Sequence, residues 1–303
     1  MPMVRKSALG FAAALIVALA APALAEDAWY AWSPKPDKLV PYGKNKPVTR
    51  LSAVLARHKS EKRWSEQVIL TPRYDVKWIE AQPGDKSPTM YWGDDRVFWV
   101  VWGGQIRFTI EGQEPFVASK GFLVQVPYRT VYSMETVGDK PSLRLEVNIA
   151  GAHTMYPADE KPVPLDGVNF VKVQINGQGK YEHGNRPYID FNAVVAGTEK
   201  QRRFIADDRA VANIIIGDPK KQQPVTDANR GHFHEESPEF WFILLGKMEY
   251  KIGDLPIFIA DQGDIVYTPK QTWHRARFAG SDMACRLAMN GYQDLLHDYQ
   301  APE

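Results

Sequence analysis

The chain carries an internal repeat at an offset of 142 residues. Without a gap, ten residues of the segment 98–130 are identical to their counterparts in 240–272. The matched positions include glycines and prolines, which fix turns and which two unrelated β segments have no reason to share. The repeat therefore predicts two copies of one small domain. The identical pairs are Phe98/Phe240, Trp99/Trp241, Gly104/Gly246, Ile110/Ile252, Phe116/Phe258, Ala118/Ala260, Gly121/Gly263, Val124/Val266, Pro127/Pro269 and Thr130/Thr272.

From Glu66 onward the sequence pattern is typical of short β-strands. Apolar runs are separated by Gly, Pro and Asp, as expected of strands joined by turns. Two short helices are expected outside the repeats, one capped by Thr49 with Leu51, Val54 and Leu55 on one face, and one over 292–299. The chain is therefore predicted to be mostly β. The predicted strand runs are Gln67–Leu70, Val97–Trp102, Gln105–Ile110 and Gly121–Val126.

The first 25 residues have the pattern of a secretory signal peptide. Arg5 and Lys6 precede an apolar run of 8–21, and small residues at Ala23 and Ala25 favour cleavage before Glu26. The apolar run is shorter than the roughly 20 residues that span a bilayer, which disfavours a membrane anchor. The predicted organisation is a signal peptide at 1–25, an arm with a short helix at 26–65, and domains at 66–157 and 165–296. The join is placed near residues 157–164.

Composition restricts the partners of the mature chain. Lysine and arginine total 37 against 36 acidic residues, so nothing suggests nucleic acid, which calls for a basic surface. The single cysteine, Cys285, excludes an internal disulfide and is expected to be buried and inert. We therefore expect a periplasmic or secreted protein that binds a small molecule and, after signal cleavage, no membrane. Homo-oligomer formation is left open.

Three of the seven histidines fall in the second repeat with metal-ligand spacing. On a β-strand His232 and His234 would lie on the same face, about 7 Å apart. Glu239 follows the Ser237–Pro238 turn and would face back toward them, and His274 ends the segment that begins at Gly263. Three imidazoles and one carboxylate suit a divalent transition metal, with positions left free for water or substrate if the metal is six-coordinate.

At these residues the sequence resembles the cupin superfamily. His232, His234, Glu239 and Gly246 fit its first motif, in which Thr226 replaces the leading glycine. Gly263, Pro269 and His274 fit the second motif. The resemblance implies an all-β fold of two jelly-roll type cupin barrels in tandem, a bicupin, with the four ligand positions filled in the second barrel. It specifies the fold and the metal site and leaves the reaction open.

The first repeat departs from this pattern at every ligand position. Met90, Trp92, Val97 and Tyr132 stand 142 residues before the four predicted ligands, and none of them is an ordinary ligand of such an ion. The first barrel is therefore predicted to bind no metal. A small-molecule pocket lined by Trp92 and Tyr132 remains an alternative.

Strand alternation predicts what surrounds the metal. Counted from Glu239, Trp241 and Ile243 point inward; counted from His274, Ala276 and Phe278 do so, while Arg275 and Arg277 face away. Trp241, Ile243 and Phe278 are thus candidates for the lining of an apolar, aromatic pocket. Glu235 and Glu236 are either proton-transfer groups near the metal or part of a solvated turn.

The predicted function is that of a metal-dependent cupin enzyme, most simply a dioxygenase-like oxidoreductase acting on a small, mainly apolar or aromatic substrate, with Glu239 as a catalytic residue. A lyase, decarboxylase or isomerase and a non-catalytic small-molecule or metal-binding protein are the alternatives. Oxalate decarboxylation is disfavoured, because cupins with that activity usually carry an arginine where this chain has Asn229. Family resemblance favours Fe or Mn, whereas folding outside the cytoplasm favours Cu or Zn.

Overall fold

The structure is a computed structural model that describes residues 38–93, 95–148, 155–157, 166–167, 169, 176–206, 210–225 and 231–291. All of them fall within one compact unit, Trp32–Glu303. The described residues form mainly β-strands, which confirms the expected all-β class. The signal peptide, the predicted join apart from Pro157, and the C-terminal helix lie outside them. No helix among them is both long and apolar enough to cross a bilayer.

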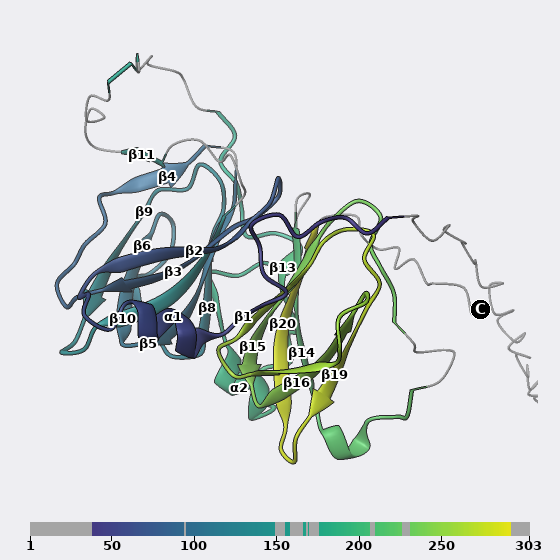
Figure 1. Cartoon of the computed structure of the whole chain (residues 1–303). Helices are drawn as coiled ribbons and strands as arrows, with labels where there is room; N and C mark the ends of the chain where they lie inside the picture. The colour runs from purple at the N-terminus through teal and green to yellow at the C-terminus, as the bar shows by residue number, and fades with distance from the viewer. Residues whose placement is uncertain are drawn as a thin grey trace, which may run out of the picture. The chain divides into compact units, whose positions relative to one another are not determined.

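In the part of the chain that the structure describes, twenty strands are arranged in antiparallel sheets. Figure 1 colours the first half from purple through blue to teal and the second from green to yellow. The first-half strands are β1 (Val48–Thr49), β2 (Trp64–Leu70), β3 (Asp75–Ala81), β4 (Met90–Trp92), β5 (Val97–Gly103), β6 (Gln105–Ile110), β7 (Phe116–Ser119), β8 (Phe122–Val126), β9 (Tyr132–Val137) and β10 (Ser142–Asn148). The remaining strands are β11 (Met155–Pro157), β12 (Tyr188–Asp190), β13 (Arg203–Ala206), β14 (Ala210–Gly217), β15 (Glu239–Leu245), β16 (Lys247–Ile252), β17 (Phe258–Asp261), β18 (Ile265–Thr268), β19 (His274–Ala279) and β20 (Ala284–Gly291).

The strand pairing of β2–β10, the first repeat, recurs in β13–β20, the second repeat. Two sheets have the orders β12-β8-β5-β10-β3-β2 and β1-β18-β15-β20-β14-β13, and corresponding strands occupy corresponding places in them. The pairing of individual residues also recurs at the offset of 142. Examples are Val97↔Val126 and Glu239↔Thr268, Phe98↔Val147 and Phe240↔Met289, and Ile110↔Tyr132 and Ile252↔His274. The sequence repeat is therefore a repeat of strand register.

The two repeats exchange their leading segments. Strand β1 and helix α1 (Leu51–Arg57) precede the first repeat, yet β1 pairs with β18 of the second. Strand β12 and helix α2 (Phe191–Val195) precede the second repeat, yet β12 pairs with β8 of the first. A 3-10 turn, η1 (Pro219–Lys221), follows β14. The predicted domain limits remain predictions, and these pairings cross them.

Helix α1 begins differently from the prediction. Its N-cap is Arg50, whose side chain makes no capping bond, while Thr49 lies in β1. The N–H of Leu51 instead donates to Asp264 Oδ1 of the second repeat, at 3.1 Å. Leu51 and Val54 are buried as expected, but Leu55 is exposed. The helix start is thus fixed by a distant carboxylate, which local capping patterns cannot reveal.

Three apolar clusters form the core. One joins the repeats, with ring contacts such as Trp78–Phe242 at 5.6 Å and Phe98–Phe204 at 5.5 Å between centroids. The other two lie one in each repeat and contain Trp99 and Trp241 respectively. Alternation along β15 and β20 sends one face of each strand into the shared cluster and the other face into the cluster of the second repeat. That second face holds the predicted site.

Candidate metal centre

The segment before β15 is tied to the start of β19 by a short two-way backbone bridge. His232 N donates to His274 O at 3.0 Å, and His274 N donates to His232 O at 2.8 Å. Gly231, with φ of 134°, permits this approach, since a Cβ there would lie 2.4 Å from the His274 carbonyl oxygen. His232 and His274 are therefore held side by side by the backbone itself.

The four predicted ligands meet at one point. Their donor atoms, three imidazole nitrogens and a carboxylate oxygen, all lie within 4.8 Å of one another. Oε2 of Glu239 lies 2.8 Å from His234 Nε2 and 3.0 Å from His274 Nε2, and the latter is 3.2 Å from His232 Nε2. Lone pairs aimed at one point repel unless a proton or a cation lies between them. We refer to these four residues as the ligand group, and they could hold a metal ion.

The ligand group is mostly buried, and hydrogen bonds hold its carboxylate in the ionised form. His234, Glu239 and His274 are buried, and His232 is half-buried. Burial alone would raise the pKa of Glu239, but the hydrogen bonds from His234 and His274 outweigh it and hold that pKa well below its usual range. The carboxylate is therefore ionised at any ordinary pH. An ionised carboxylate among imidazoles is a suitable donor set for a divalent transition metal.

One imidazole is oriented by the backbone. His274 Nδ1 lies 2.9 Å from the Thr272 carbonyl oxygen, to which it can only donate. A proton is thereby held on Nδ1, so that Nε2, which faces the ligand group, becomes a lone-pair donor once its own proton is displaced by a cation. A hydrogen bond of this kind from the non-ligating nitrogen is usual for metal-bound histidines. Sequence reasoning missed Thr272 in this role, although Thr130/Thr272 belongs to the repeat identities.

The residues named as pocket lining lie in the apolar cluster of the second repeat. Trp241 and Ile243 are buried there, with Ala276 and Phe278 packed against the cluster. The Trp241 ring lies 5.1 Å from the His274 ring, between centroids. Arg277 Nη2 donates instead to the Gln223 carbonyl oxygen at 2.6 Å. The ligand group thus borders an aromatic, apolar interior, whereas a substrate-binding role for these residues remains a prediction.

Three further sequence candidates have ordinary surroundings. Glu235 is half-buried and accepts a hydrogen bond from Gln271 Nε2 at 3.0 Å, and Glu236 is exposed. Cys285 is buried as predicted, and burial raises the pKa of its thiol to about 12. The thiol therefore stays protonated.

Tyr250 is a neighbour of the ligand group that sequence reasoning did not single out. It is fully buried on β16, and its ring lies 5.1 Å from that of Trp241. Burial raises its pKa, so the hydroxyl stays protonated. Alternation along β16, counted back from Ile252, would have placed it on the inward face.

The corresponding positions of the first repeat are occupied by a packed aromatic group. Tyr132 pairs with Met90 across the ladder, as His274 bridges to His232. Trp92 Nε1 donates to the Tyr132 hydroxyl at 2.9 Å, and Val97 is fully buried. The Trp99 ring contacts Tyr132 at 5.4 Å. The polar atoms of Trp92 and Tyr132 thus hydrogen-bond to each other, and Met90 and Val97 add only buried apolar contacts.

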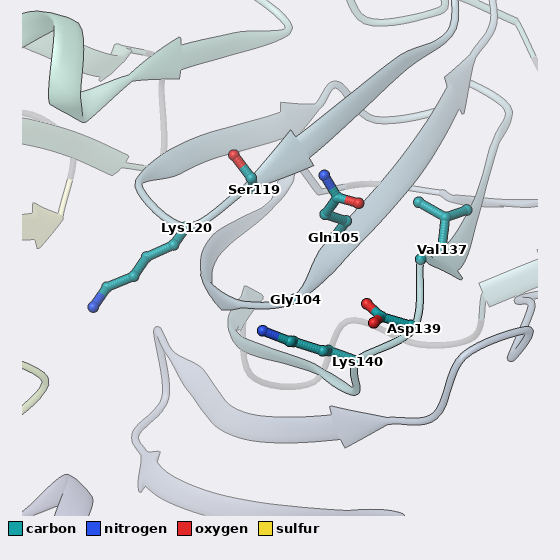
Figure 2. Close-up of a pocket in the computed structure, with 8 residues that line it drawn as sticks. Gly104, Gln105, Ser119, Lys120, Val137, Asp139 and Lys140 are labelled. Carbon is teal, nitrogen blue, oxygen red and sulfur yellow. The ribbon is translucent and has the colours of Figure 1, made fainter.

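A surface depression of about 390 Å³ lies at the turn end of β6, β7 and β9. Figure 2 shows its lining, which includes Gln105, Ser119, Val137 and Lys140. It contains no residue of the ligand group and none of the four counterparts in the first repeat. It is therefore separate from the predicted site.

Comparison with known proteins supports the fold. Residues 222–290 match a family model described as a cupin domain. The chain is similar to a cupin 2 conserved barrel domain protein from Leptotrichia buccalis, with a TM-score of 0.54, 14% identity, and coverage of 80% of this chain and 94% of that one. The protein Ylba from E. coli is similar with a TM-score of 0.50 and 13% identity, over 79% of this chain and 86% of that one. A tryptophan-to-tyrosine variant of oxalate decarboxylase from Bacillus subtilis has a TM-score of 0.48 and 12% identity, over 85% of this chain and 78% of that one. No curated protein matches in sequence. Residues 222–290 therefore match a cupin domain, and for the rest of the chain identities this low show a likeness of fold alone.

Proposed function

We propose that this chain is an exported, metal-dependent bicupin enzyme, a dioxygenase-like oxidoreductase acting on a small, mainly apolar or aromatic substrate. The observation that carries the proposal is the ligand group, in which three imidazole nitrogens and the Glu239 carboxylate converge beside an apolar interior. Buried ionisable groups that serve only the fold usually form pairs of opposite charge. Four donor groups that converge at cupin ligand positions are better explained by a bound cation.

The residues of the second repeat have distinct parts in this proposal. His232, His234, Glu239 and His274 would hold a divalent transition metal, which when bound supplies a Lewis acid for a substrate oxygen or, if redox-active, a site for dioxygen. Glu239 stays ionised because its pKa is held low, and it balances the cation. Trp241 and Ile243, both buried, keep bulk water from one side of the ligand group.

The first repeat is proposed to be a barrel that has no metal. Met90, Trp92, Val97 and Tyr132 supply neither an imidazole nor a carboxylate, and their hydrogen bond and ring contacts leave no unsatisfied donor set. Its part is then structural, through the apolar cluster that joins the repeats. An empty small-molecule pocket lined by Trp92 and Tyr132 is disfavoured by this packing.

The metal and the compartment are proposed together. Export in an unfolded state would let the site form in the periplasm or outside the cell, where Cu or Zn competes with the Fe or Mn that the family favours. We expect a site that accepts several metals and is active with one. The Irving–Williams order makes affinity alone a poor guide to the active metal.

The test is to refold metal-free protein separately with Fe(II), Mn(II), Cu(II) and Zn(II), and to measure oxygen consumption against one panel of small aromatic and aliphatic substrates. The expected result is oxygen-dependent turnover with one redox-active metal. Turnover without oxygen consumption would favour the lyase, decarboxylase or isomerase alternative. Equal inactivity of all four forms, while a substrate still binds, would favour a binding protein.

A further inference from the structure

The inward-facing residues next to the ligand group also differ between the two repeats. Along β15, β16, β19 and β20 the inward-facing residues that come next after the ligand group are Trp241, Tyr250, Ala276 and Ala288, and the ladders place Trp241 opposite Ala288 and Tyr250 opposite Ala276. We call these four residues the second layer. Their counterparts in the first repeat, at the offset of 142, are Trp99, Phe108, Met134 and Glu146.

In the first repeat this layer is filled, and its indole N–H and its carboxylate are hydrogen-bonded to each other. Glu146 Oε2 accepts a hydrogen bond from Trp99 Nε1 at 2.8 Å. The charge of Glu146 also acts on Arg144, two residues earlier on the same face, and favours its protonated form against the burial that lowers its pKa. Phe108 and Met134 fill the remaining space with apolar groups.

The second repeat keeps the tryptophan and the arginine but has lost the carboxylate. Ala288 takes the place of Glu146, so Trp241 Nε1 lacks the carboxylate acceptor that Trp99 Nε1 has. Arg286, the counterpart of Arg144, forms no ion pair with any described residue; its Nε is buried without an acceptor, as is the Nε of Arg144, but Arg286 has no equivalent of the Glu146 charge on its face. Two alanines in place of Met134 and Glu146 also remove side-chain volume beside Trp241.

The second repeat has gained one hydroxyl in the same place. Tyr250 stands where the first repeat has Phe108, so the fold does not require a hydroxyl there. Tyr250 Oη is buried and has no hydrogen-bond partner among the described residues. A buried polar atom without a partner is costly and is explained by a ligand or an ordered water.

We propose that the second layer binds the carboxylate of a small organic acid, with Tyr250 Oη and Trp241 Nε1 as donors and Arg286 as the balancing charge. In the first repeat the Glu146 side chain occupies the equivalent place and makes the equivalent contact. The proposal rests on the proposed function, because it makes the second layer the specificity site for the substrate of the adjacent ligand group. The apolar part of the acid would occupy the space left by Ala276 and Ala288.

The test uses the full chain with its metal content measured in each variant, and isothermal titration calorimetry with acetate and benzoate. Benzamide, which has the shape of benzoate without its charge, is the matched neutral probe. We expect benzoate or acetate to bind the unmodified protein, and benzamide to bind at least about tenfold more weakly, since a hydrogen bond to a charged group is worth that factor or more.

Three variants separate the contributions. Ala288→Glu restores the built-in carboxylate and should lower carboxylate affinity about tenfold or more, and Tyr250→Phe should lower it about tenfold, both without change in metal content. Met283→Glu adds the same charge at an exposed position nearby and should leave affinity unchanged. Glu146→Ala is the reciprocal change, and acetate should partly restore the thermal midpoint that this variant loses.

Each outcome decides one proposal. If neither carboxylate binds a fully metal-loaded protein, or if Ala288→Glu and Tyr250→Phe bind them as well as the unmodified chain, the second layer is no carboxylate site and an ordered water satisfies Tyr250. If carboxylates bind in the second layer but no metal binds, the proposed function fails while this inference stands.

Discussion

In the first repeat, Tyr132 stands across the ladder from Met90 and accepts a hydrogen bond from Trp92. In the second, His274 bridges to His232 at the same register and shares a carboxylate with His234. These two positions pair in the same way in both repeats, and the side chains that they carry differ. This strand arrangement does not require the ligand group, because the first repeat forms it with apolar and aromatic residues at the same positions.

The first repeat should not tolerate a ligand from the second. Val97 is the fully buried counterpart of Glu239, and the first repeat has Met90, Trp92 and Tyr132 where the second has its histidines. Val97→Glu should destabilise the protein by about 3–5 kcal/mol, the range for an unpaired buried charge, without adding a metal. Urea unfolding and elemental analysis measure the two effects. Val117→Glu, on an exposed position of β7, is the control and should change stability by less than about 0.5 kcal/mol.

The two helix starts should differ in what they depend on. Asp190 caps α2 within its own segment, where its side chain accepts from Asn192 N. Asp264 accepts from Leu51 N and from Arg50 Nη1 across the repeats. Asp264→Ala should cost about 1–3 kcal/mol because it leaves a buried N–H unpaired, and Asp190→Ala about 1 kcal/mol. A smaller loss for Asp264→Ala than for Asp190→Ala in urea unfolding would contradict the contacts of Asp264 with Leu51 and Arg50.

The aromatic group of the first repeat should be structural. Tyr132→Phe removes the acceptor of the Trp92 indole and should lower stability by about 1 kcal/mol. Metal content should not change, since burial raises the pKa of the Tyr132 phenol and keeps it protonated. Loss of one metal equivalent in this variant would show that the first repeat does bind a metal.

The smallest expected difference lies at the end of α1, which carries charges that the end of α2 lacks. Burial lowers the pKa of His58, but hydrogen bonds and charge from Glu61 and Glu66 outweigh it and raise that pKa. The stabilisation is then full below the ordinary histidine pKa and is lost as pH rises through the raised value. His58→Gln should therefore cost less than about 1 kcal/mol at pH 5 and almost nothing at pH 9. A cost that grows with pH would contradict this assignment.

The sequence predicted what depends on pattern and missed what depends on distant pairing. The offset of 142 carried the strand register, and motif spacing brought together His232, His234, Glu239 and His274. The exchange of β1 and β12 was missed because only two or three residues pair in each ladder and no offset links them to their partners. The Arg50 helix start was missed for the same reason, since its fixing residue, Asp264, is more than 200 positions away.

The second layer could have been read from the sequence only after the register was known. Ala288 and Glu146 lie beyond the run of identities, and an alanine carries no signal of its own. Their meaning comes from the ladder that places Glu146 opposite Trp99 and Ala288 opposite Trp241. Once this pairing is known, the difference between Glu146 and Ala288 is a difference in charge and side-chain volume beside the ligand group.

Metal stoichiometry distinguishes the two repeats most sharply. We expect one divalent metal per chain in the unmodified protein, a strong loss in His234→Ala, and none in the double variant His232→Ala/His274→Ala. The matched double variant of the first repeat, Met90→Ala/Tyr132→Phe, should keep its metal. Unchanged metal in the histidine double variant, or two metals per chain of which one is lost with Met90 and Tyr132, would contradict the account.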